Sequence, residues 1–133
     1  MITRLSKVVL LALSIIWAPS VAAQDVCSSL DGASIIAQDS DNTFLGKIIN
    51  SFDSDSIFNE FGTYGNDFSS DSIWNEYSTF GNEFNSESPF NEFSSDPLMI
   101  IKDGQIIAYL STNKSIQGAI SPNLLKALCK DVL

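Results

Sequence analysis

The sequence predicts a small α+β protein: a small sheet of hairpins flanks a turn-rich aromatic repeat of 16 residues, and a helix ends the chain. Three observations support this class. Two runs of β-branched and aromatic residues each contain a turn signal, the stretch between them repeats itself, and the last segment has a helix start signal. The chain length of 133 residues allows one such domain.

The first 23 residues have the pattern of a secretory signal peptide. Arg4 and Lys7 form its charged start, an apolar run covers residues 8–17, and Val21-Ala22-Ala23 supplies the small residues of a cleavage site. The apolar run is shorter than the roughly 18 residues needed to cross a bilayer. We therefore expect a mature domain of residues 24–133 that has no membrane span and is secreted or periplasmic.

The charge of the chain excludes one class of partner. There are 7 basic and 16 acidic residues, and removal of Arg4 and Lys7 with the signal peptide leaves a net charge of −11. Because binding to nucleic-acid phosphates requires a basic surface, we expect no nucleic-acid partner. The chain also has no His, so the commonest general base and a common metal ligand are missing.

Two cysteines lie near the ends of the mature domain, Cys27 and Cys129. An even number of cysteines in an exported chain predicts a disulfide. No Cys-x-x-Cys pair or His accompanies them, which argues against a redox or nucleophilic thiol. Closing a loop of roughly 100 residues stabilises a fold by up to about 4.7 kcal/mol in the chain-entropy model.

The sequence predicts its strands and its final helix from turn and cap residues. One hairpin covers residues 34–48, and a second covers residues 98–111 around Asp103-Gly104, a strong hairpin signal. Because isolated hairpins are marginally stable, we expect both in one sheet. A Ser-Pro pair at Ser121, with Ser as N-cap and Pro at the first helical position, predicts a helix over residues 121–131.

Between the hairpins, residues 52–97 repeat every 16 residues. The three copies are FDSDSIFNEFGTYGND, FSSDSIWNEYSTFGNE and the shorter FNSESPFNEFSSDP. Such similarity predicts that the copies pack against one another. Aromatic spacings of three and four residues favour one short helical turn in each copy, followed by a tight turn at the glycines.

The repeat holds 11 of the 14 aromatic residues of the chain, and they have two interpretations. The first, which we favour, is that they form the core, because Phe dominates and has no polar tip. The second is an exposed platform for a protein or polysaccharide partner, made by Trp74, Tyr77 and Phe80.

Carboxylates also recur, and no Lys or Arg occurs from residue 48 to residue 101. Calcium takes oxygen ligands, so these side chains are candidate ligands. The Asp39-x-Asp41 pair, however, lacks the Gly and Glu of an EF-hand, and no calcium-binding nonapeptide array is present. We favour solvated acids without a cofactor and keep calcium as the alternative. The candidate ligands are Asp55, Asp71 and Glu87 before the repeated Ser, and Glu60, Glu76 and Glu92 after the repeated Asn.

The repeat resembles one found in small exported bacterial proteins of uncharacterised function, which have tandem Ser-Ile-x-Asn-x-Tyr-Gly-x-Tyr-Gly units. Residues 56–65 and 72–75 match this unit, and residues 96–98 and 102–104 match the link and hairpin that follow it. Phe replaces several Tyr, and Ser78 stands where Gly is usual. The resemblance implies export and a bacterial origin, and it supplies no activity.

These patterns predict an exported, non-enzymatic interaction or surface-associated module of unknown partner. One alternative is a calcium-dependent repeat domain. A more distant alternative is a carboxylate-based hydrolase, which would need two carboxyl groups that face each other in a cleft, about 5 to 9 Å apart.

Overall fold

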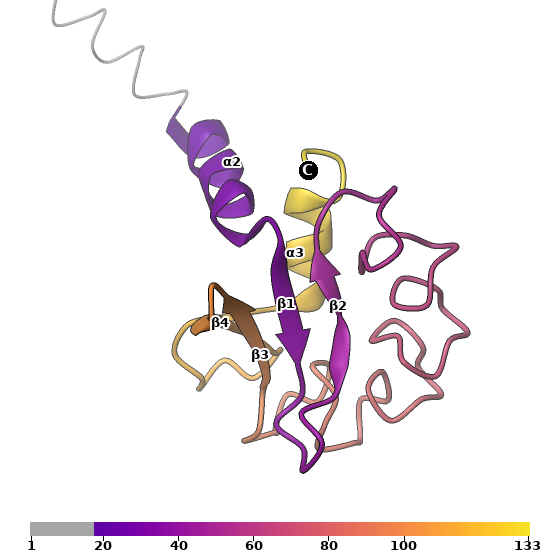
Figure 1. The fold of residues 1–133 in the computed structure, drawn as a ribbon. Helices are drawn as coiled ribbons and strands as arrows, with labels where there is room; N and C mark the ends of the chain where they lie inside the picture. Colours follow the sequence, from indigo (N-terminus) through magenta and orange to yellow (C-terminus); the bar gives the residue numbers. More distant parts are fainter. Residues whose placement is uncertain (1–17) are drawn as a thin grey trace, which may run out of the picture.

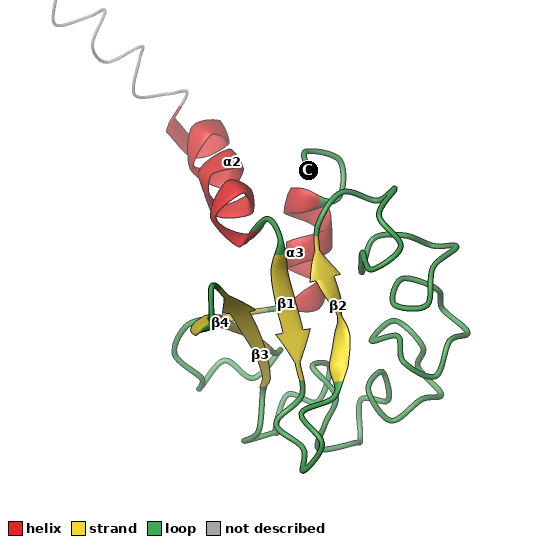
Figure 2. Cartoon of the chain, in the orientation of Figure 1, coloured by secondary structure: helices red, strands yellow, loops and turns green. Residues whose placement is uncertain are grey.

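The computed structural model describes residues 18–133, which form one five-stranded sheet, two helices and a long turn-rich segment (Figure 1 and Figure 2). The strand order is β2-β1-β3-β4-β5. The predicted α+β class, with a small sheet and a C-terminal helix, is confirmed. The strands are β1 (Ala33–Ile36), β2 (Phe44–Ile48), β3 (Leu98–Lys102), β4 (Gln105–Leu110) and β5 (Ala119–Ile120).

The two hairpins share one sheet because β1 pairs antiparallel with both β2 and β3. Strand β4 pairs antiparallel with β3 through a turn at Asp103-Gly104, where both residues have positive φ angles of 53° and 77°. A two-residue type I′ turn needs such angles at both central positions, which is why Asp-Gly occurs there. The short β5, which pairs parallel with β4, lies in a stretch that the sequence patterns do not assign to a strand.

The core lies between one face of the sheet, helix α3 (Pro122–Cys129) and the inner side of the repeat. Alternate strand residues such as Ile35 and Ile100 are fully buried there, together with Leu125 of α3. Helix α3 begins where the sequence predicts: the Ser121 side chain accepts the backbone N–H of Leu124, and Pro122 follows. It ends at Cys129, two residues before the predicted end.

The predicted disulfide is confirmed. Cys27 and Cys129 are bonded, with their Cα atoms 5.4 Å apart, and the bond joins α3 to helix α2 (Ala18–Leu30). Helix α2 continues across the predicted cleavage site after Ala23, and most of the predicted signal peptide lies outside the described residues. Among residues 18–133, no helix has the length and apolar character that a membrane span requires.

The repeat follows β2 and lies along the outer side of that strand, where it forms a series of loops (Figure 1). Its first copy is joined to β2 by backbone hydrogen bonds: Lys47 donates to the Asp55 carbonyl, and Ile57 donates to the Lys47 carbonyl. The expected short helical turn in each copy is wrong, because residues 50–97 contain no helix. The reason lies in the side chains that begin each turn.

Candidate functional site

The repeat is a ladder of reverse turns, most of them three residues apart. The carbonyls of Asn50, Asp53, Ser56 and Asn59 each accept the backbone N–H three residues further on. One longer step follows, in which the Gly62 carbonyl accepts the N–H of Asn66. Four steps of three residues and one of four return the chain to an equivalent Asn, which explains the 16-residue period.

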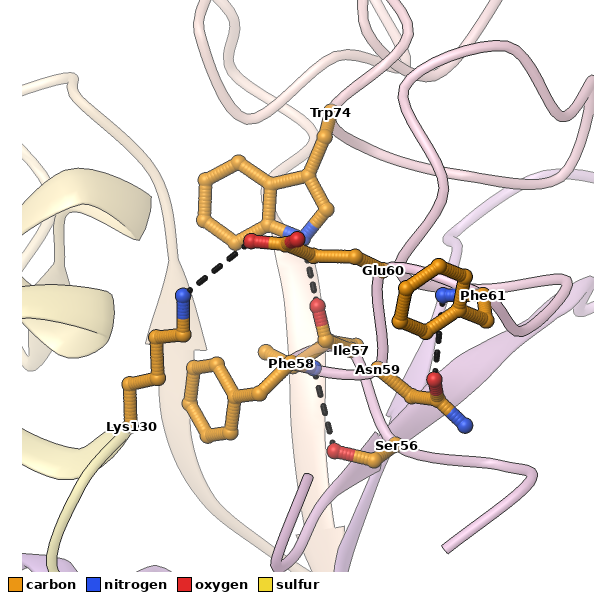
Figure 3. A network of polar contacts seen from close by, with 8 residues as sticks. All are labelled: Ser56, Ile57, Phe58, Asn59, Glu60, Phe61, Trp74 and Lys130. Carbon is orange, nitrogen blue, oxygen red and sulfur yellow. Dashed lines mark hydrogen bonds and ion pairs between the residues drawn. The ribbon is translucent and has the colours of Figure 1, made fainter. Parts of the chain in front are cut away.

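Short polar side chains hold most of the turns. The Ser56 hydroxyl oxygen accepts the N–H of Phe58 at 3.0 Å, and Asn59 Oδ1 accepts the N–H of Phe61 at 3.0 Å (Figure 3). Asn and Ser side chains that bond the backbone two residues later compete with helix formation. This competition is the physical reason why spacings of three and four produce turns here instead of helix.

The repeated Asn makes a second contact that ties neighbouring turns together. The Nδ2 group of Asn59 donates to the Asp53 carbonyl at 3.2 Å, and Asn75 and Asn91 make the equivalent bonds to Ser69 and Asn85. Each of these Asn residues therefore fixes its own turn and the one that begins six residues earlier.

The turns that begin with Ser56, Ser72 and Ser88 direct apolar side chains into the core. Ile57 and Ile73 follow Ser56 and Ser72 and are fully buried. The next residue in these turns packs between copies: the Trp74 Nε1 group donates to the Ile57 carbonyl at 2.6 Å, and the Trp74 ring lies 6.0 Å from the Phe90 ring between centroids. These contacts join each copy to the next.

The turns that begin with Asn direct their aromatic side chains outward. Six such turns place an aromatic residue two positions after the Asn, and these side chains are 84% to 95% exposed. They are Phe52, Phe61, Phe68, Tyr77, Phe84 and Phe93. The aromatic residues of the repeat are thus divided between the core and the solvent, and the core interpretation holds only for the inward group.

The predicted platform of Trp74, Tyr77 and Phe80 does not exist as a unit. Tyr77 is exposed, whereas Trp74 and Phe80 are partly buried and pack against the core. The prediction is wrong because residues three positions apart lie in successive turns, and each turn changes the direction of the chain. The informative signal was the residue two positions before each aromatic: Asn precedes the exposed ones, and Ser precedes Phe58, Trp74 and Phe90.

The exposed aromatics alternate with exposed carboxylates. In five of the six outward turns, the residue between the Asn and the aromatic is acidic and exposed: Glu60, Asp67, Glu76, Glu83 and Glu92. We call these five acids and the six outward aromatics the acidic aromatic surface. Only Glu60 has a basic partner within residues 18–133, where Lys130 Nζ lies 3.2 Å from its carboxylate.

The surface contains two open hollows between aromatic side chains. The larger one, about 480 Å³, lies mainly in the third copy, with Glu83 at the end of the second copy as part of its lining. A smaller one, about 330 Å³, lies at the junction of the first and second copies, between Phe61 and Phe68. The larger hollow is lined by Glu83, Phe84, Phe90, Asn91, Glu92 and Phe93.

Two lysines contact the repeat: Lys126 of α3 and Lys130, the residue that follows the helix. Lys126 Nζ lies over the Trp74 ring, 4.5 Å from its centroid, and Lys130 pairs with Glu60. Figure 3 shows the Lys130 ammonium reaching the Glu60 carboxylate. The chain therefore contains one example of two lysines, four residues apart at a helix end, placed against an aromatic ring and an acid of the repeat.

The six candidate calcium ligands do not form a group. Asp55, Asp71 and Glu87 are partly buried, whereas Glu60, Glu76 and Glu92 are exposed. In the described part of the chain, no three acidic, His or Cys side chains are placed to hold one metal ion together.

Three titratable groups near the repeat have perturbed pKa values. Burial raises the pKa of Glu87, and the neighbouring charges of Asp39 and Asp96 raise it further. The Glu87 Oε2 atom is also buried without a hydrogen-bond partner. Burial and nearby acids similarly raise the pKa of Tyr64, whereas hydrogen bonds from the hydroxyl and N–H of Thr43 lower the pKa of Asp39.

No protein-family model matches the chain, and neither a curated protein nor a solved structure matches it. The site must therefore be interpreted from its own chemistry.

Proposed function

We propose that the protein is an exported, non-enzymatic interaction module that binds its partner through the acidic aromatic surface. The observation that carries this proposal is the exposure of six aromatic side chains, each 84% to 95% exposed, at equivalent positions of the turn ladder. Turn formation uses the Asn side chain and the backbone and does not require an aromatic residue two positions later. Exposed apolar side chains gathered on one part of a molecule are typical of interaction sites.

Several features support an interaction module over an enzyme. The chain has no His, and the carboxylates of the surface are exposed. The general acid of a glycosidase, by contrast, lies in an apolar environment that keeps it protonated. The larger hollow is lined mainly by Phe and acidic side chains, which can hold a partner without reacting with it.

Two features support export from a bacterial cell. The first residues have the signal-peptide pattern, and disulfides such as Cys27–Cys129 persist mainly in oxidising compartments. The resemblance of the repeat to small exported bacterial proteins supports the same location, which we take to be the periplasm or the medium.

A binding panel tests this proposal. The full chain is expressed with its leader, purified in its disulfide-bonded form and titrated with basic peptides, acidic peptides, uncharged polysaccharides and lipid vesicles. We expect at least one class to bind and to shift backbone NMR signals of the outward turns. A variant with Phe61→Ser, Tyr77→Ser and Phe93→Ser should lose this binding.

The matched control replaces three exposed apolar residues outside the repeat: Ile106→Ser, Leu124→Ser and Val132→Ser. These side chains are 50% to 53% exposed, and this variant should bind like the unmodified chain. Equal binding by the two variants, or no binding by any member of the panel, would contradict the proposed function.

A further inference from the structure

The partner of the acidic aromatic surface can be narrowed by its charge. Five carboxylates alternate with the six outward aromatics, and no Lys or Arg occurs from residue 48 to residue 101. Four of these carboxylates have no ion-pair partner within residues 18–133. A partner that covers the surface therefore has to supply positive charge and groups that pack on aromatic faces.

The chain itself shows a geometry that satisfies both needs. Lys126 and Lys130 are four residues apart at the C-terminal end of α3, and their side chains reach Trp74 and Glu60, respectively. The ammonium over the ring makes a cation–π contact, and the second ammonium makes an ion pair. Trp74 belongs to the second copy of the repeat and Glu60 to the first, so this basic pair spans two neighbouring copies.

The 16-residue period places an equivalent acid and an equivalent aromatic residue one copy further along the chain. Glu76 corresponds to Glu60, and Phe90 corresponds to Trp74. No lysine of the described chain is paired with Glu76. Phe90 lines the larger hollow together with Phe84 and Phe93, and Glu83 and Glu92 complete that lining. By this correspondence, a second basic pair would reach Glu76 and the Phe90 side of the hollow, whose carboxylates Glu83 and Glu92 have no ion-pair partner within residues 18–133.

We propose that this hollow of the third copy, together with Glu76, binds a basic polypeptide segment whose Lys or Arg side chains are spaced one helical turn apart. The inference rests on the proposed function and names the partner class for the same surface. Uncharged polysaccharide would pack on the rings but would leave the carboxylates uncompensated. A second copy of this chain would bring like charges together, since the mature domain has a net charge of −11.

The probe is an alanine-based helical peptide of about 20 residues with lysines at intervals of four, and its control has Gln at every lysine position. We expect the lysine peptide to bind the full, disulfide-bonded chain and the Gln peptide not to bind. Affinity should fall as salt increases, because exposed charge pairs are screened. The NMR signals that shift should belong to residues 75–93.

Two pairs of variants separate the contributions of charge and aromatic rings. Glu76→Gln, Glu83→Gln and Glu92→Gln together should weaken binding about tenfold, whereas Asp31→Asn, Asp41→Asn and Asp131→Asn, which change the net charge equally, should have little effect. Phe84→Ser with Phe93→Ser should also weaken binding about tenfold, whereas Ile106→Ser with Leu124→Ser should not. All of these positions are exposed, so thermal unfolding should show that every variant folds.

The outcomes distinguish this inference from the proposed function. Binding of an uncharged polysaccharide at the same turns, with no binding of the lysine peptide, would overturn the basic partner and leave the interaction module standing. Dimerisation that Phe84→Ser abolishes would likewise replace the basic partner with a second copy. Equal losses in the charge variant and its control would show that only net charge acts, which would also overturn the proposed hollow. Failure of every probe would contradict both proposals.

Discussion

Turns that begin with Ser56 or Ser72 and turns that begin with one of the six Asn residues have the same local hydrogen bonds, but they direct the side chains that follow in opposite directions. In both, a side-chain oxygen accepts the N–H two residues later. After Ser56 and Ser72 the chain buries Ile57 and Ile73 completely, whereas after the six Asn residues it exposes an aromatic side chain. The local hydrogen bonds therefore form the ladder, and the direction of each turn decides whether the side chain that follows is buried in the core or exposed to solvent.

The largest expected effect comes from removing an inward side chain. Ile73→Ala should lower the free energy of unfolding by about 2 to 5 kcal/mol, because it leaves a cavity in the core. Tyr77→Ala, four residues later in an outward turn, should change it by less than about 0.5 kcal/mol. Chemical denaturation measures both, and similar losses for the two variants would refute the division between inward and outward turns.

The second largest effect on stability comes from the side chains that begin the turns. The Ser72 hydroxyl accepts the N–H of Trp74 and donates to the Tyr64 carbonyl, and Ser72 is fully buried. Ser72→Ala should lower the free energy of unfolding by about 1 to 3 kcal/mol, because it removes both hydrogen bonds of a fully buried residue. Asn82→Ala, in a partly exposed turn where water can replace the bond to Phe84, should cost about 0.5 kcal/mol. Thermal unfolding monitored by circular dichroism compares them, and a larger loss at Asn82 would reverse the comparison.

A smaller effect separates an inward acid from an outward one. The raised pKa of Glu87 means that the folded chain holds this proton more tightly than the unfolded chain, so ionisation destabilises the fold as pH rises through the folded pKa. Glu87→Gln should therefore raise the melting temperature at pH 7. The difference in melting temperature between this variant and the unmodified chain should disappear below the ordinary Glu pKa of about 4.3, because Glu87 is then neutral in both the folded and the unfolded chain.

Glu76→Gln is the control for Glu87→Gln, because Glu76 is exposed and lies in an outward turn. It should leave the melting temperature nearly unchanged at both pH values. A melting temperature at pH 7 that falls in the Glu87 variant would contradict the assignment of a buried, desolvated charge.

The smallest expected effect is that of calcium. Because the recurrent acids of the repeat are divided between partly buried and exposed positions, millimolar calcium should leave the melting temperature unchanged, and so should EDTA. A clear increase in melting temperature with calcium, reversed by EDTA, would support the calcium-dependent alternative. It would also require the outward acids to move together.

Sequence patterns predicted the elements that depend on local chemistry or on covalent pairing. Asp103-Gly104 located the second hairpin turn, Ser121 located the start of α3, and Cys27 and Cys129 had no other partner. The patterns missed β5, which exists only because β4 offers it an edge to pair with. They also missed α2 beyond the signal-like segment, because its contact with α3 is made through the distant Cys129.

The sequence predicts the candidate site only in part. The spacing of the aromatic residues does not indicate which of them are exposed, whereas the residue that begins each turn does. The local pattern is sufficient for the 16-residue period and the turn heads, since an Asn or Ser side chain bonds its own backbone whatever surrounds it. Which face of the ladder meets β2 and α3 is decided by packing, because burial depends on segments that are distant in the sequence. The same packing placed Lys126 over Trp74 and Lys130 beside Glu60, and it left the equivalent position in the third copy open.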